Sequence, residues 1–152
     1  MTPPSTPPTL PDPSQRFRRL LIAGVTLSGV LYLASLGLPV LVFENHEPVS
    51  GAEVLAVGWM GPFAAGQFAW YANPLYFATI VLTLRSKFGL ALAFALPAVG
   101  IALTSPQSHT WYFNESTGTP IARLAGTWMV WLAAIAVAGL TSVAGCFLRR
   151  TA

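Results

Sequence analysis

Four long hydrophobic stretches follow one another along the chain, and short polar segments separate them. A helix needs roughly 20 mainly apolar residues to cross a bilayer. The first stretch, 20–43, has no charged residue and as a helix would exceed a hydrocarbon core of about 30 Å. The pattern predicts an all-α fold, an integral membrane four-helix bundle. We expect its spans at about 20–43, 62–84, 88–104 and 121–148.

The second stretch is too long for one crossing. It runs from 51 to 84, which is about 51 Å of helix. Ser50 and Glu53 have the spacing of a capping box, so a helix should begin directly after Ser50. Pro62 should then interrupt that helix, because proline lacks the backbone N–H and clashes with the preceding turn. We therefore expect a short interfacial helix at 51–60 before the second span.

The beginning of the chain differs from the rest. Residues 1–14 are rich in proline and hold no aromatic side chain, so they cannot form a packed core and should be a disordered cytoplasmic tail. Residues 15–150 should then form one four-span membrane domain. The segment "RFRR" at 16–19 followed by an apolar run also fits a signal peptide, but the run is longer than the usual apolar region of roughly 7–15 residues. A retained helix is favoured.

Composition supports a bilayer environment. Only 9% of the residues are charged and 54% are hydrophobic, whereas soluble domains carry about 25% charged residues. The net charge is +3, but the basic residues form no stripe for nucleic acid, so no nucleic-acid partner is expected. They fit the positive-inside rule if both termini are cytoplasmic, with Arg123 as the exception. The residues that obey it are Arg16, Arg18, Arg19, Arg85, Lys87, Arg149 and Arg150.

The segment "GQFAWYANPLY", 66–76, places polar groups within the second predicted span. Asn73 falls at the middle of that span, where an amide must face another helix or a cavity. Pro74 would leave the carbonyl of Trp70 without its helical donor. Packing between helices is the favoured interpretation, and a transporter or channel that uses this helix break is the alternative. The candidate polar site comprises Gln67, Trp70, Tyr71, Asn73, Pro74 and Tyr76.

The outer loops carry the only candidates for metal ligands. His46, Glu47 and His109 could hold a divalent ion if the two loops met, but they match no ligand spacing, so a solvated acidic loop is favoured. The single cysteine, Cys146, excludes an internal disulfide. No catalytic arrangement or glycine-rich phosphate motif occurs. We expect no enzymatic activity and no cofactor.

Small residues recur every four positions in two of the predicted helices, which permits close helix contact. They are Ala91 and Ala95 in the third, and Ala134, Ala138, Ser142 and Cys146 in the fourth. These faces could pack inside the bundle or against a second membrane protein or copy. The preferred function is a structural or accessory membrane protein that associates through them. Aromatic residues near the outer boundaries should form an interfacial belt, namely Trp59, Trp111, Tyr112 and Trp128.

The pattern of Gly58 and Trp59 followed by 66–76 resembles small bacterial inner-membrane proteins of four helices that carry no assigned activity. The resemblance covers mainly 58–76. It implies a bacterial inner (plasma) membrane, and it brings no catalytic or ligand residues to this chain.

Overall fold

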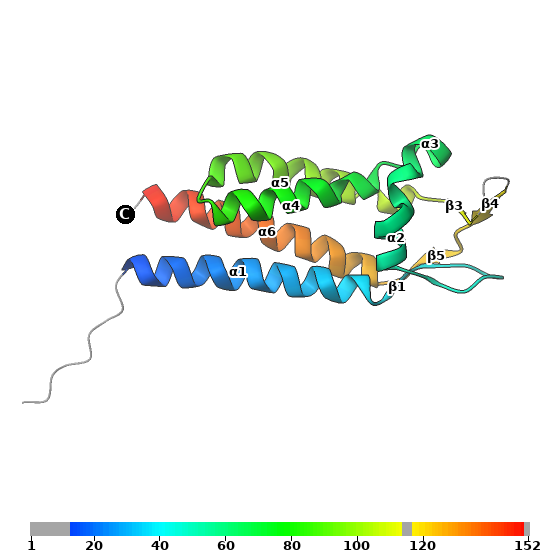
Figure 1. Cartoon of the computed structure of the whole chain (residues 1–152), viewed down its shortest axis with the longest axis horizontal. Helices are drawn as coiled ribbons and strands as arrows, with labels where there is room; N and C mark the ends of the chain where they lie inside the picture. Colours follow the sequence, from blue (N-terminus) through cyan, green and yellow to red (C-terminus); the bar gives the residue numbers. More distant parts are fainter. Residues whose placement is uncertain (1–12, 114–116, 151–152) are drawn as a thin grey trace, which may run out of the picture.

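The computed structural model describes residues 13–113 and 117–150. Its long helices are α1 (Pro13–Leu36), α4 (Ala72–Leu84), α5 (Phe88–Ala102) and α6 (Thr127–Arg150). They lie side by side, and α6 runs between α1 on one side and α4 with α5 on the other (Figure 1). Three segments of the described chain are long and apolar enough to cross a membrane: Gln15–Leu36, Phe88–Gln107 and Thr127–Arg149.

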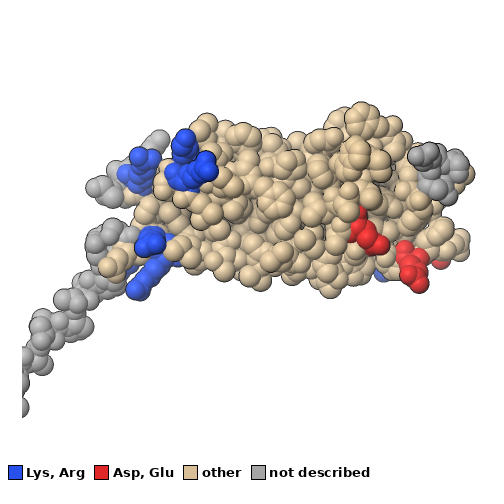
Figure 2. Space-filling model, viewed as in Figure 1, with Lys and Arg blue, Asp and Glu red and all other residues tan. Residues whose placement is uncertain are grey.

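Charge divides the two ends of this helix assembly (Figure 2). Lys and Arg side chains gather where α1 begins, where α4 turns into α5 and where α6 ends, and we call this the basic end. The described glutamates, Glu44, Glu47 and Glu53, belong to the opposite end, which we call the acidic end. Arg123 also lies in the segments of the acidic end. Of the predicted tail, 1–12 lies outside the described residues, and Pro13 already begins α1.

Short elements cover the acidic end (Figure 1). The helical ones are α2 (Gly51–Val57), η1 (Gly58–Met60), α3 (Gly61–Ala65), η2 (Ala69–Tyr71) and η3 (Ser105–Gln107). The strands are β1 (Pro39–Val42), β2 (Val49–Ser50), β3 (Thr110–Tyr112), β4 (Gly118–Pro120) and β5 (Arg123–Leu124). β1 pairs antiparallel with both β2 and β5, and β3 pairs antiparallel with β4. The structure is mostly helical, and the prediction of a purely all-α chain is wrong.

Two predicted span boundaries are displaced because apolar residues serve a second, smaller core. The predicted helix 20–43 ends at Leu36, and Pro39 opens strand β1 instead. The residue before a proline is disfavoured in helical conformation. The predicted helix 121–148 begins only at Thr127, because Arg123 and Leu124 pair with β1. The buried members of this second core are Leu41, Phe43 and Val49.

The predicted span 62–84 is not one helix. Pro62 opens α3, which ends after Ala65 because Gly66 adopts a left-handed conformation with φ of 64°. The backbone N–H groups of Gly66 and Gln67 both donate to the carbonyl of Gly61, the second at 3.2 Å, and close the end of α3. α4 starts at Ala72 and has 13 residues, which is about 20 Å. The predicted span 88–104 agrees closely with α5.

The expected helix after Ser50 is present. The Ser50 hydroxyl accepts from the Glu53 backbone N–H at 3.3 Å, and the Glu53 carboxylate accepts from the Ser50 backbone N–H at 2.7 Å. This reciprocal cap starts α2, and η1 continues it to Met60. The expected interfacial segment 51–60 is thus helical, with a change of helix type at Gly58.

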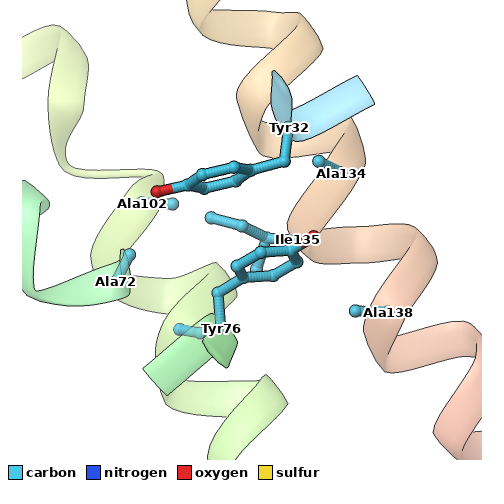
Figure 3. Packing of buried hydrophobic residues seen from close by; sticks show 8 residues of the cluster. Tyr32, Ala72, Tyr76, Ala102, Ala134, Ile135 and Ala138 are labelled. Atoms are coloured by element: carbon cyan, nitrogen blue, oxygen red, sulfur yellow. The ribbon is translucent and has the colours of Figure 1, made fainter. Parts of the chain in front are cut away.

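The core of the long helices combines stacked tyrosines with alanines (Figure 3). The rings of Tyr32 and Tyr76 stack with centroids 4.7 Å apart and planes 9° apart, and Ala72, Ala134 and Ala138 lie around them. Alanine lets helix backbones approach closely. The small-residue faces are therefore used inside the chain, since Ala91, Ala95, Ala134, Ala138 and Ser142 are all buried.

Gly24 lies at a close approach of α1 to α6. A Cβ atom added at Gly24 would collide with the side chain of Thr141, including its Cγ2 at 2.9 Å. Gly29, on the same helix, has no heavy atom within 4 Å of such a Cβ. Replacing Gly24 by alanine therefore tests packing against α6, whereas the same change at Gly29 tests helix propensity alone.

We predict that Gly24→Ala lowers the free energy of unfolding in detergent by about 1–3 kcal/mol, the usual cost of overpacking. Gly29→Ala should be neutral or slightly stabilising, because alanine is the better helix former. Adding Thr141→Ala to Gly24→Ala should recover part of the loss. Equal melting temperatures for the two glycine variants would contradict this close packing of α1 on α6.

Candidate functional site

Asn73 lies in the first turn of α4, close to the acidic end. Its partners are Tyr32, four residues before the end of α1, and Trp131, four residues after the start of α6. Four residues correspond to about 6 Å of helix. Asn73 therefore lies at the start of a helix and not in the middle of a continuous helix 62–84, because α4 begins at Ala72.

The Asn73 amide joins three parts of the chain. Its Oδ1 accepts from the Tyr32 hydroxyl and from Trp131 Nε1, each at 2.9 Å. Its Nδ2 donates to the Trp70 carbonyl at 2.8 Å. That carbonyl is the one to which residue 74 would donate in a regular helix, and Pro74 has no N–H. The amide thus replaces a missing backbone bond while it binds α1 and α6.

The other residues of the predicted polar site are bonded separately. Trp70 Nε1 donates to the Leu55 carbonyl at 2.8 Å, and the Tyr71 hydroxyl donates to the Trp59 carbonyl at 3.3 Å. Gln67 Nε2 donates to the Thr110 carbonyl at 3.3 Å. These bonds fasten η2 to α2 and η1, and the segment between α3 and η2 to β3. The six residues do not converge on one point; Gln67, Trp70 and Tyr71 attach the short elements of the acidic end to each other.

Hydroxyl groups occupy the interior between Asn73 and the basic end. The Tyr76 hydroxyl lies 3.0 Å from Ser28 Oγ, which donates to the Ala134 carbonyl at 2.8 Å. Thr83 Oγ1 and Ser142 Oγ lie 2.7 Å apart. In the described part of the chain, no buried side-chain nitrogen or oxygen lacks a hydrogen-bond partner. The buried hydroxyls of the described interior are therefore all bonded within the chain.

A cavity of about 1020 Å³ lies at the acidic end. Its walls come from α2, η1, α3 and the strands, while Asn73 and Trp131 belong to the ends of the long helices. The chain has five tryptophans, and all of them line this cavity: Trp59, Trp70, Trp111, Trp128 and Trp131. An interfacial belt was expected from three of them, so sequence reasoning missed that they share one cavity.

The lining is mainly apolar, and several of its polar side chains already bond within the chain. The indole N–H groups of Trp70 and Trp131 donate to protein oxygens. Glu53 is the one charged side chain among the described lining residues, and it caps α2. Hydrogen bonds from the Ser50 backbone N–H and from its hydroxyl hold the pKa of Glu53 below its ordinary value. The cavity thus suits an apolar guest.

Glycine makes part of this wall possible. A Cβ atom added at Gly58 would come within 2.6 Å of Cδ1 of Trp70. The indole of Trp70 therefore packs directly on the backbone of η1. The sequence alone does not predict that Gly58 contacts Trp70, because the contact depends on the turn at Gly66 between them.

The candidate metal ligands do not form a metal site in the described residues. His46 and His109 are both exposed, and the ring of His46 stacks on Phe113 with centroids 4.9 Å apart. Glu47 is exposed as well. Across 13–113 and 117–150, no group of three or more histidine, cysteine or acidic residues could hold an ion. Glu115, which also belongs to the outer loops, lies outside the described residues.

The fold and the cavity define a mostly helical protein with three segments able to cross a membrane and an aromatic cavity at one end. Comparisons with models of protein families, with curated proteins and with solved structures find no match. The chemistry of the cavity itself is therefore the basis for assigning a function.

We predict that Asn73→Leu destabilises the protein, because the buried donors of Tyr32 and Trp131 lose their acceptor. Each unsatisfied donor costs about 1–3 kcal/mol. Gln67→Leu is the matched control, since that amide makes one longer bond and should cost below about 1 kcal/mol. Denaturation in mild detergent measures both.

A double-mutant cycle isolates the Asn73 bond to α1. Tyr32→Phe removes the hydroxyl, so combining it with Asn73→Leu should cost less than the sum of the single changes. Coupling between contacting residues is typically about 0.5–3 kcal/mol. Additive effects, or Asn73→Leu as stable as the parent protein, would show that the amide does not fasten α1 to α4.

Proposed function

We propose that the chain is a multi-pass inner-membrane protein in which all four long helices cross the bilayer and both termini are cytoplasmic. The clustering of Lys and Arg at the basic end supports this orientation, because positive residues favour the cytoplasmic side. α4 alone covers about 20 Å, so η2 and α3 would complete its crossing. Irregular backbone at membrane depth is tolerated where it is buried in protein or lines a cavity.

Within this membrane placement, we propose that the protein binds the hydrocarbon chain of a lipid-like molecule in the tryptophan-lined cavity. The observation that carries the proposal is that all five tryptophans line one cavity of about 1020 Å³. Among its described lining residues only Glu53 is charged, and its carboxylate is used to cap α2. Small-molecule sites are usually concave and apolar with few polar groups. Burial of each CH₂ group contributes about 0.8 kcal/mol.

The surroundings of the cavity also favour a guest from the membrane. Phe63 of α3, which lines the cavity, is 83% exposed. Trp59 and Met60 of η1 are exposed as well. Exposed apolar patches of this kind mark surfaces that meet lipid or protein. In a membrane these side chains would contact lipid. Lipid hydrocarbon chains would then lie next to the cavity and could enter it.

A structural or accessory role through the small-residue faces has less support. Ala134, Ala138 and Ser142 are already buried against neighbouring helices of the same chain. A partner protein or second copy would need other surfaces. Transport past Asn73 has less support too, because each polar atom of its amide has a partner within the chain.

We predict saturable binding of the fluorescent fatty acid cis-parinaric acid to the purified protein in mild detergent. Energy transfer from the tryptophans to the bound probe gives the signal. Ala56→Phe, which places a ring at a lining residue of α2, should weaken binding about tenfold or more, because the ring takes up space that the guest would fill and overpacking typically costs about 1–3 kcal/mol. Ala52→Phe is the matched control, because Ala52 lies on α2, is exposed and does not line the cavity.

Two results would contradict a hydrocarbon site in this cavity. One is energy transfer that rises linearly with probe concentration, as partition into detergent would give. The other is equal affinity of Ala56→Phe and Ala52→Phe when both variants melt at the temperature of the parent protein.

A further inference from the structure

A second recess lies at the basic end, where α4 turns into α5. Ser86 adopts a left-handed conformation with φ of 55° and leads into Lys87, which directly precedes α5. This turn and the end of α6 border a shallow, open cleft of about 520 Å³. Lys87 and Arg149 belong to its lining, so two cations from two separate elements meet at one recess. We call it the basic cleft.

The charges at the basic cleft have no acidic counterpart among the described residues. Lys87 and Arg149 are both exposed, and the described glutamates lie at the opposite end of the molecule. Arg149 Nη1 donates to the Ser86 carbonyl at 3.3 Å. This bond holds the guanidinium over the cleft and leaves its remaining donors for another acceptor, since a guanidinium has five N–H donors.

The remaining walls of the basic cleft are apolar. Leu90 is 54% exposed, Phe88 is buried, and Cys146 is half-buried. Phe88 and Leu90 belong to the first turn of α5, and Cys146 lies one turn before Arg149 on α6. Cations at the rim and apolar side chains along the helices match the two parts of a phospholipid.

We propose that the basic cleft binds an anionic phospholipid, with the headgroup phosphate on Lys87 and Arg149 and an acyl chain against Leu90 and Cys146. Charge-assisted bonds from Arg and Lys to phosphate oxygens are among the stronger hydrogen bonds in proteins. Basic pockets between membrane helices on the cytoplasmic side bind anionic headgroups. The proposal rests on the membrane placement given above and is independent of the tryptophan-lined cavity.

Charge alone does not single out this place, because Arg16 and Arg18 of α1 also lie at the basic end and are exposed. They do not line the basic cleft. Replacing them removes the same number of charges from the same end of the molecule. They therefore provide the control that separates a defined lipid site from general attraction to an anionic surface.

The test is native mass spectrometry of the full chain in an uncharged detergent, titrated with phosphatidylglycerol and with phosphatidylcholine of the same acyl chains. We expect one preferred phosphatidylglycerol in the parent protein. The double variant Lys87→Gln with Arg149→Gln should bind it about tenfold or more weakly, given the attraction of each basic residue for anionic lipid. Arg16→Gln with Arg18→Gln should change this affinity less than about twofold.

Three results would overturn the proposal: equal loss of lipid in both double variants, equal binding of the two lipids, or displacement of phosphatidylglycerol by millimolar glycerol phosphate. The third would assign the cleft to a soluble phosphate compound. An unchanged melting temperature of the Lys87 and Arg149 variant in detergent checks that it is folded. Because this check needs no ligand in the tryptophan-lined cavity, the two proposals can fail separately.

Discussion

The Asn73 amide holds the acidic end of the molecule in place. Its oxygen binds α1 through Tyr32 and α6 through Trp131, and its nitrogen binds the Trp70 carbonyl. A buried amide with unmet bonds would cost more than it contributes. Because these partners come from three segments, the bonds fix where α4 begins relative to α1 and α6. The cavity walls then follow, since Trp70 and Trp131 line it.

The tryptophan-lined cavity exists because the second hydrophobic stretch does not form one helix. Gly66 reverses the chain after α3, and Pro74 fits the first turn of α4, where a missing N–H is tolerated. The shortened α4 leaves space beside the acidic ends of α1 and α6. Short elements with apolar side chains enclose this space instead of filling it. The same chain break thus accounts for the polar cluster around Asn73 and for the apolar cavity next to it.

Sequence reasoning succeeded where one local rule decides the structure. The spacing of Ser50 and Glu53 located the start of α2, and the charge-free stretch after Lys87 located α5. It failed where two structures share one pattern: Val40 and Leu41 are as apolar as a helix interior but form β1. Asn73 was identified as an interior residue, yet its depth depends on the start of α4. The cavity could not be predicted, because its tryptophans come from four separate elements, η1, η2, β3 and α6, which only the folded chain brings together.

Photolabelling tests the central claim most directly. A fatty acid with a diazirine at the end of its chain, added to the protein in bilayers and mapped by peptide sequencing, reports where the hydrocarbon chain lies. If the cavity binds the hydrocarbon chain, labelling concentrates on cavity residues of α2, η1 and η2, such as Ala56 and Ala69, and is lost with excess unlabelled fatty acid. Labelling spread over exposed side chains such as Leu33 and Leu140, without competition, would contradict a hydrocarbon-binding cavity.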